Sequence, residues 1–373
     1  MKQINDLKMQ ISILLPYKER FDKNLPSSVV ITIKNNLFKS KFKKNIKVYG
    51  KKVDTPISKE NFFGVEDPIF FKSKNKNLAN VMCKDILKDI HKDHIIEIHN
   101  RPYLFKLIYK KLKKYHVCIF FHNDPQHMKG SKKIEERLNL LKNSKMIYCV
   151  SKYIKRRFLE GIEDKFTNIK VLYNGVDKKV NKMPKKNREV IFVGRLVPEK
   201  GIHIYVDAIE KIFEKFPLWK FSIIGSSYLG SYSKDTQFAK NQYTKFKKIG
   251  KQAQFTGFLN PEKVCQKMKK ASIIVIPSLW EEPFGLVAAE AMANGIAIIA
   301  SKVGGIPEII EKNGVLIKDI SVEKLAKELS KMMTNNLNIV KYQKLAWQNF
   351  KLSSNASSMK LDKYREQILE DLK

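Results

Sequence analysis

The most constraining feature of this sequence is a short apolar strand that runs into a helix through a loop. Residues 273–276 are all β-branched, which is typical of a buried strand. Pro283 and Gly285 then interrupt regular structure, and the alanine-rich segment after them predicts a helix that ends at Gly295. A strand, a loop and a helix in this order are one repeat of an α/β protein with a parallel sheet.

Two glutamates flank this junction, with Glu282 in the loop and Glu290 inside the helix. The backbone N–H groups of Gly285, Leu286 and Val287 begin the helix without intrahelical partners, so they favour an anionic group. Carboxylates on either side can accept hydrogen bonds from hydroxyl groups. The arrangement fits a diphosphate with a sugar at one end and a ribose at the other. An exposed acidic loop followed by an ordinary helix glutamate is the alternative interpretation.

A second motif lies upstream, where a strand at residues 189–193 runs into the loop that contains Gly194, Arg195 and Lys200. Apolar residues at helical spacing follow until Pro217. Cations at the start of a helix are unfavourable unless an anion completes the site. Because the chain has 72 basic residues, an accidental pair is the alternative.

Residues 277–295 resemble the signature of family-4 retaining glycosyltransferases with the GT-B fold, which is a glutamate, seven residues and a second glutamate. The resemblance implies that Glu282 binds hydroxyls of the donor sugar and that Glu290 binds the ribose. It also implies that Arg195 and Lys200 neutralise the leaving diphosphate. The anomeric configuration is then retained, with the departing phosphate oxygen accepting the proton of the acceptor hydroxyl. The predicted donor-binding residues are Gly194, Phe284, Gly285, Leu286, Val287 and Glu290.

We expect neither a metal nor another cofactor beside the nucleotide-sugar co-substrate. The sequence contains no Asp-x-Asp pair that would hold a divalent ion against the diphosphate. Arg195, Lys200 and the helix amides are therefore expected to supply the stabilising charge. A metal site built from His122, Asp124 and His127 is a weaker alternative, because one short loop would supply all of its ligands.

Polar loops also follow two strands in the first half of the chain. His122 follows the strand at 117–121, and the resemblance implies that it is a catalytic residue that contacts the donor; a histidine that only caps the strand end is the alternative. His99, Asn100, Arg101 and Lys129 are predicted on the acceptor side. These loops resemble those of bacterial lipopolysaccharide-core glycosyltransferases of the α-1,2-N-acetylglucosaminyltransferase kind. This implies UDP-N-acetylglucosamine or another UDP-sugar as donor, and a lipopolysaccharide-core or other glycolipid or glycan acceptor.

The 373 residues are expected to form two domains, each with its own core. Strands alternate with helices in the rhythm of a doubly wound protein. We predict the GT-B fold, with two Rossmann-like domains facing each other across a cleft. The predicted strands lie at residues 9–15, 29–33, 94–98, 117–121, 146–150, 190–193, 221–224, 273–276 and 296–300. The predicted boundaries are 1–177 for the acceptor-side domain, 178–345 for the nucleotide-sugar domain, and 346–373 for a helix that crosses back, reaching Leu372.

The net charge of +35 suggests an anionic partner, although much of it fits a solvated surface. Two predicted helices in the first half carry basic faces, which suit an anionic membrane surface or a lipid-linked acceptor. No pattern typical of a nucleic-acid-binding module is present, so nucleic acid is not expected. The basic residues of these two faces are Lys106, Lys110, Lys113, Lys152, Arg156 and Arg157.

The four cysteines, Cys83, Cys118, Cys149 and Cys265, have no metal or disulfide spacing and are expected to be reduced. The sequence has neither a signal peptide nor eighteen consecutive apolar residues, so we expect a cytoplasmic protein, soluble or peripheral on the inner face of the membrane.

Two loops differ from known phosphate-binding or donor-binding patterns. Residues 225–230 lack the ending of a phosphate loop and are expected to be a turn. The family's glycine pair after the first strand is replaced by Leu25, Pro26, Ser27 and Ser28.

Two functions of other classes stay open. A GT-B sugar-nucleotide epimerase would share the donor site and would turn over its substrate without an acceptor. A catalytically inactive membrane scaffold would bind lipid through the basic helices and would turn over no donor.

Overall fold

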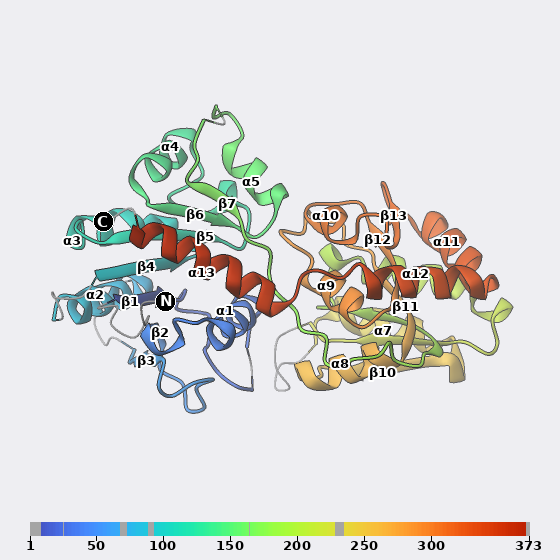
Figure 1. Ribbon diagram of the computed structural model, residues 1–373. Coiled ribbons are helices and arrows are strands. Elements are labelled where there is room, and N and C mark those ends of the chain that lie inside the picture. Colours follow the sequence, from blue (N-terminus) through green and yellow to red (C-terminus); the bar gives the residue numbers. More distant parts are fainter. Residues whose placement is uncertain are drawn as a thin grey trace. The chain divides into compact units, whose positions relative to one another are not determined.

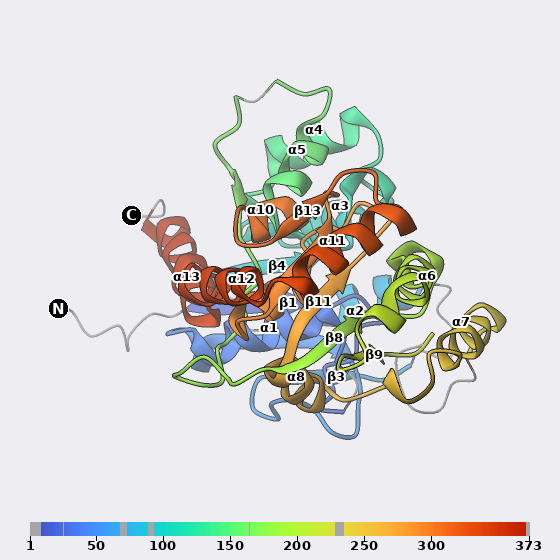
Figure 2. The same ribbon diagram turned by 90° about the vertical axis from the view of Figure 1, so that its right-hand side faces the viewer.

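The computed structural model describes residues 9–24, 26–67, 73–88, 93–163, 165–227 and 235–370 (Figures 1 and 2). The chain forms two compact units, here called the first unit (Met1–Gly175 and Ser354–Lys373) and the second unit (Val176–Ser353). Residues 176–177 and 346–353 thus belong to the second unit, whereas the predicted boundaries placed them elsewhere. The predictions for Leu25, for residues 228–230 and for Leu372 concern positions outside the described residues.

Seven described strands of the first unit form a parallel sheet in the order β3-β2-β1-β4-β5-β6-β7. The central strands are rich in isoleucine, as expected for strands covered on both faces. The strands are β1 (Met9–Leu14), β2 (Ile46–Lys51), β3 (Phe62–Val65), β4 (Asp93–His99), β5 (His116–Phe121), β6 (Met146–Cys149) and β7 (Ile169–Val171). The helices are α1 (Ser28–Lys39), α2 (Lys74–Ile86), α3 (Phe105–Lys111), α4 (Ile134–Asn143), α5 (Lys152–Leu159) and α13 (Ser354–Glu370), with 3-10 turns η2 (Lys43–Asn45), η3 (Pro102–Leu104) and η4 (Pro125–His127).

One predicted strand is wrong, because residues 29–33 lie inside helix α1. The hydroxyl of Ser27 accepts a hydrogen bond from the backbone N–H of Val30 at 3.3 Å and caps the helix. Val30, Ile33 and Leu37 are buried, which is the spacing of one helical face. The capping hydroxyl and this spacing outweigh the strand preference of the β-branched residues.

Six described strands of the second unit form another parallel sheet, in the order β10-β9-β8-β11-β12-β13. Helices α6 and α11 pack beside each other against it (Figure 2). The strands are β8 (Asn187–Val193), β9 (Lys220–Ile224), β10 (Ala253–Gly257), β11 (Ala271–Ile276), β12 (Ala297–Ser301) and β13 (Val315–Ile317). The helices are α6 (Ile202–Ile212), α7 (Gln237–Lys247), α8 (Pro261–Lys270), α9 (Leu286–Ala293), α10 (Ile306–Ile310), α11 (Val322–Thr334) and α12 (Asn336–Gln348), with 3-10 turns η5 (Pro198–Lys200), η6 (Phe213–Lys215) and η7 (Gly250–Gln252).

Both sheets have the strand order of the Rossmann fold, so the prediction of two doubly wound α/β domains is confirmed. In each sheet the order reverses once, between β1 and β4 in the first unit and between β8 and β11 in the second. Ligands of such sheets bind beyond the carboxyl ends of the strands at this reversal. Among the described residues, none of the helices combines the length and the apolar character that a bilayer span requires.

Helix α13 returns to the first unit and lies along α1 (Figure 1). Its Arg365 is 1% exposed and donates two hydrogen bonds to the carboxylate of Glu97 on β4, at 2.8 and 2.9 Å. It also donates to Asp362 at 3.0 Å, and Asp362 accepts a hydrogen bond from the hydroxyl of Ser40 at 2.7 Å. A buried, bidentate ion pair therefore joins the last helix to the sheet.

We predict that Arg365→Ala lowers the free energy of unfolding by about 3–5 kcal/mol, because it leaves the buried Glu97 carboxylate without its cation. Lys363→Ala, on an exposed position of the same helix, should change it by less than about 0.5 kcal/mol. Denaturant unfolding of the full chain measures both values. Equal effects of the two substitutions would contradict the structural role of the ion pair.

Candidate functional site

The candidate site in the second unit lies at the carboxyl edge of its sheet, where the order reverses. The loop after β8 contains Gly194, Arg195 and the turn η5, and the loop after β11 contains Glu282. Since β8 and β11 are paired in parallel, both loops leave the sheet at the same edge. β12 lies next to β11, so its following loop, with Gly304, joins them there.

Lys200 and Glu282 meet at this edge. Turn η5 ends at Lys200, whose Nζ lies 2.5 Å from Oε1 of Glu282 and 5.2 Å from the ring centroid of Trp280. The same carboxylate oxygen accepts a hydrogen bond from the hydroxyl of Ser278 at 2.7 Å. Both partners are largely buried, with side-chain exposures of 22% for Lys200 and 10% for Glu282, so solvent screens the pair less than a surface pair.

Two glycines allow these loops to approach so closely. Gly201 has a φ of +67°, and a Cβ atom there would lie 1.9 Å from the carbonyl oxygen of Pro277. Gly304 has a φ of +55°, and its Cβ atom would lie 2.2 Å from the carbonyl oxygen of Glu282. The next residue, Gly305, donates its N–H to that oxygen at 2.7 Å. A side chain at Gly201 or Gly304 would therefore require the backbone to shift.

The start of helix α9 presents unpaired donors at the same edge. Gly285 caps the helix in the left-handed conformation, with a φ of +94°, and Phe284 before it is 4% exposed. No acceptor among the described residues takes the N–H groups of Leu286 and Val287. These groups, with the helix dipole, can hold an anion.

Glu290 lies in the third position after this pair of N–H groups, inside α9. Its side chain is half-buried, and loss of solvation raises the pKa of its carboxyl to about 7. Within the described part of the chain, no hydrogen bond ends on this carboxylate. Glu290 therefore retains its full capacity to accept hydrogen bonds from a ligand.

Arg195 is exposed and makes no hydrogen bond or ion pair with a described residue. Its backbone is fixed from both sides, since Gly194 donates its N–H to Ile224 and Leu196 donates its N–H to Ser226, each at 3.1 Å. Lys200 and Glu282 are thus in direct contact. Arg195 lies in the same loop as Lys200 and at the same edge of the sheet, but its guanidinium has no partner among the described residues.

In the first unit, His99 and His122 form a buried pair. Nδ1 of His99 lies 2.8 Å from Nε2 of His122, and the two rings are stacked with their centroids 5.1 Å apart. Asn100, at a φ of +52°, accepts the backbone N–H of His122 on its side chain at 2.8 Å. Burial lowers the pKa of His122 to about 4 and that of His99 well below its usual value, so both rings are neutral at pH 7.

The other predicted acceptor-side residues are less closely joined to this pair. Arg101 donates to the carbonyl of Asn100 at 2.6 Å, and exposed Lys129 lies over the ring of Tyr103, 5.8 Å from its centroid. On the predicted basic faces, Lys106 and Lys110 are exposed on α3, while Lys113 lies beyond the end of that helix.

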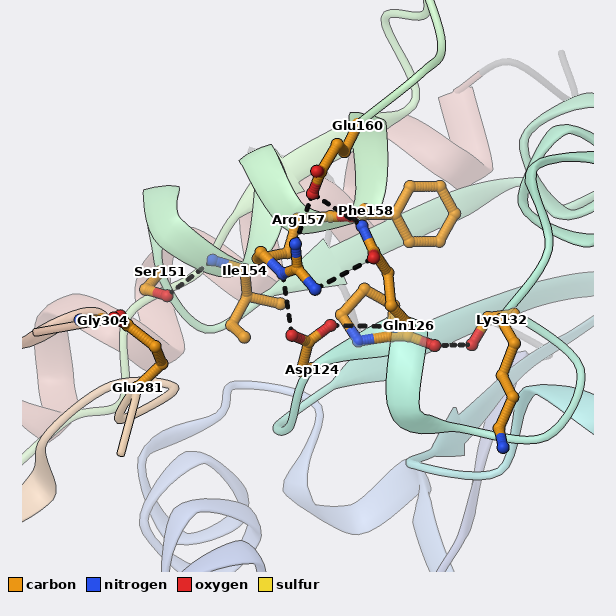
Figure 3. A network of polar contacts seen from close by, with 12 residues as sticks. Asp124, Gln126, Lys132, Ser151, Ile154, Arg157, Phe158, Glu160, Glu281 and Gly304 are labelled. Carbon is orange, nitrogen blue, oxygen red and sulfur yellow. Dashed lines mark hydrogen bonds and ion pairs between the residues drawn. The ribbon is translucent and has the colours of Figure 1, made fainter. Parts of the chain in front are cut away.

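The loop after His122 is held by a polar network around Arg157 (Figure 3). Arg157 donates to Asp124 at 2.8 Å and to the side-chain oxygen of Gln126 at 2.9 Å, and it also pairs with Glu160. Arg157 is therefore a structural residue rather than a member of a free basic face. Asp124 is taken up by this network, and the described residues contain no cluster with the ligands of a metal ion.

Sequence reasoning missed Ser278, Glu281 and Trp280 as parts of the site. Glu281 accepts the backbone N–H of Gly304 (Figure 3). The position of Glu281 next to Glu282 was the signal available in the sequence. Ser278 follows Pro277 directly after β11, at the strand end where polar residues gather. No sequence pattern places the Trp280 ring beside Lys200.

Comparisons with known proteins find similarity to glycosyltransferases. Residues 175–349 match the model of the family described as glycosyl transferases group 1, which covers nearly all of the second unit. An uncharacterized glycosyltransferase of Methanocaldococcus jannaschii is 34% identical over 196 residues, which are 52% of this chain and 51% of that protein. The lipopolysaccharide 1,2-N-acetylglucosaminetransferase of Salmonella typhimurium is 25% identical over 232 residues, which are 58% of this chain and 57% of that enzyme. The aligned part thus spans a little over half the length of these relatives.

Solved structures are similar over nearly the whole chain. The crystal structure of HepE from Anabaena, in complex with UDP and glucose, aligns with a TM-score of 0.71 at 18% identity and covers 96% of this chain and 100% of that one. At this identity the similarity shows the fold, and it agrees with the predicted GT-B class.

We predict that Gly201→Ala destabilises the second unit more than Gly250→Ala does. Both glycines are left-handed, but a Cβ atom at Gly250 meets nothing within 4 Å. Gly250→Ala should therefore cost only the conformational term of about 1–2 kcal/mol. Gly201→Ala adds the clash with Pro277, about a further 1–3 kcal/mol. Thermal unfolding of both variants measures the difference, and equal losses would show that the two loops can move apart freely.

Proposed function

We propose that the protein is a retaining, metal-independent glycosyltransferase that moves a sugar from a UDP-sugar to a hydroxyl of a glycolipid or glycan. The observation that carries this proposal is the meeting of Lys200 with Glu282 at the reversal point of the second sheet, beside the open N–H groups of Leu286 and Val287. The family match of residues 175–349 supports the same conclusion.

The donor is proposed to be UDP-N-acetylglucosamine, and the acceptor a lipopolysaccharide core. HepE is described in complex with UDP and glucose, and the Salmonella relative is named as an N-acetylglucosaminetransferase acting on lipopolysaccharide. In this chain, the diphosphate would bind between Arg195, Lys200 and the start of α9. Glu290 would then accept hydrogen bonds from the ribose, and Glu282 from the sugar.

The reaction is one bond exchange at the anomeric carbon. The bond from C1 to the β-phosphate oxygen breaks, and the oxygen of the acceptor hydroxyl bonds to C1 on the same face. The proton of that hydroxyl moves to the departing phosphate oxygen. Charge that develops on this phosphate is stabilised by Arg195, Lys200 and the helix amides, which are already in place before the reaction.

The histidine pair of the first unit has a binding role in this proposal. Because both rings are neutral at pH 7, His122 offers a hydrogen bond without adding charge. His99 fixes the orientation of the His122 ring through the 2.8 Å contact. Exposed Lys106 and Lys110 suit an anionic surface that carries the acceptor.

We predict that the purified protein transfers N-acetylglucosamine from UDP-N-acetylglucosamine to truncated lipooligosaccharide. Arg195→Ala should lower kcat roughly 100- to 1000-fold, because it removes one charge that stabilises the leaving phosphate. Glu282→Ala should abolish transfer, while Lys215→Ala, at an exposed position, serves as the control. Product analysis by NMR tests retention at the anomeric carbon. Undiminished transfer in both site variants would refute the site, and donor turnover without acceptor would favour an epimerase.

We predict that donor affinity rises with pH through the pKa of Glu290. The ribose needs an ionised carboxylate as acceptor, but burial holds the pKa of this group at about 7. By linkage, UDP-N-acetylglucosamine should bind roughly tenfold more weakly at pH 6 than at pH 8, with no further gain well above pH 7. Both phosphates of this donor stay ionised in that range, and His122 titrates at about 4.

Isothermal titration calorimetry of the wild type and of Glu290→Gln tests this dependence. The amide does not titrate, so the variant should bind weakly and equally at both pH values. A flat profile for the wild type would show that Glu290 does not contact the donor.

A further inference from the structure

A second candidate site is an open groove at the opposite edge of the second sheet. It has a volume of about 590 Å³ and lies at the amino ends of β8 and β9, along β10 and helix α8. Five cationic side chains line it, and we call it the basic groove. They are Arg188, Lys220, Lys263, Lys267 and Lys270.

Helix α8 places three of these lysines on one face. Lys263, Lys267 and Lys270 follow one another at intervals of four and three residues, the spacing of neighbours on a helix surface. Like charges at this spacing repel each other, so the helix alone gains nothing from them. An anion in the groove would remove this repulsion.

None of the five cations forms an ion pair with a described residue. The carboxylate that lines the groove, Glu189, is 6% exposed and is hydrogen-bonded to the hydroxyl of Ser222 at 2.5 Å. The groove differs from scattered surface lysines in that five cations converge on one concave site, whose described lining residues include a single carboxylate.

An apolar residue at the groove favours a lipid surface as its occupant. Leu218 is 71% exposed and lines the groove together with Leu259. No described residue that lines it is aromatic, so it lacks the stacking platform typical of single-stranded nucleic acid sites. Cations around an exposed leucine match a phosphate headgroup with the first methylene groups below it.

We propose that the basic groove binds the phosphate headgroups of an anionic membrane. The first three residues of β8 line the groove, and Lys200 and Glu282 lie beyond the last residue of this strand, which is 7 residues or roughly 20 Å long. A membrane at the amino edge therefore leaves the nucleotide edge of this unit open. The proposal goes beyond the glycosyltransferase function and does not depend on it.

Co-sedimentation with lipid vesicles tests this proposal on the full chain. Wild-type protein should bind vesicles that contain phosphatidylglycerol, less so at high salt, and should not bind pure phosphatidylcholine. Replacing Lys263, Lys267 and Lys270 by Gln should lower the partition coefficient roughly 100-fold, because each basic residue near an anionic surface contributes about fivefold. Leu218→Ser should lower it further.

The matched control replaces Lys327, Lys331 and Lys344 by Gln, which removes the same charge from exposed positions of α11 and α12. This variant should bind like the wild type. Equal losses in the two triple variants, or an unchanged groove variant, would overturn the proposal. The proposal would also be overturned if the groove variant lost binding to a short single-stranded RNA but still bound vesicles like the wild type.

Thermal unfolding and binding of UDP-N-acetylglucosamine check that the groove variant is folded. If it is not, Arg188→Gln combined with Lys220→Gln carries the same test from the sheet side of the groove. Donor binding also separates the two proposals, since its absence in the wild type would contradict the glycosyltransferase function and leave the vesicle result standing.

Discussion

The parallel pairing of β8 with β11 is the constraint on which the candidate site depends. Val190 lies opposite Ile273 and Phe192 opposite Val275, so two strands far apart in the sequence end side by side. The chain continues from β8 to β9 on one side and from β11 to β12 on the other. The two loops therefore diverge above the sheet, and space for a ligand is left between them.

Close backbone contact makes this edge rigid. A Cβ atom at Gly201 would lie 1.9 Å from the Pro277 carbonyl oxygen and one at Gly304 would lie 2.2 Å from the Glu282 carbonyl oxygen, both far below van der Waals contact. Catalysis by fixed charge requires such rigidity, because groups that must first reorient lose part of their effect. Ordinary surface loops would not hold Lys200 and Glu282 in this way.

The sequence predicted the parts of the fold that local patterns determine. The predicted runs rich in β-branched and aromatic residues at 190–193, 221–224 and 273–276 are strands, and the motif around Glu282 and Glu290 lies across a loop and a helix as expected. Five described strands were missed, namely β2, β3, β7, β10 and β13. β7 and β13 are three residues long and pair on one side only, which leaves little pattern. Polar residues and glycines interrupt the apolar pattern of β2 and β10, and β3 is a four-residue edge strand.

Contacts between side chains of different strands depend on the strand register, which local sequence patterns do not determine. The contact of His99 with His122 requires β4 and β5 to pair with His99 opposite Phe120. The sequence assigned both histidines to loops at strand ends but not to each other. Arg157 was likewise expected on a free basic face, because its partner Asp124 lies 33 positions earlier in the chain.

The Lys200 and Glu282 pair links the stability of this edge to the proposed donor binding. A largely buried cation without a partner is costly, and Glu282 removes that cost for Lys200. A diphosphate carries two negative charges and could replace the single carboxylate as the partner of Lys200. In the proposed function, Glu282, which also accepts a hydrogen bond from Ser278 at 2.7 Å, would then be available to the hydroxyls of the sugar. The same carboxylate would thus serve first the stability of the loops and then the binding of the donor.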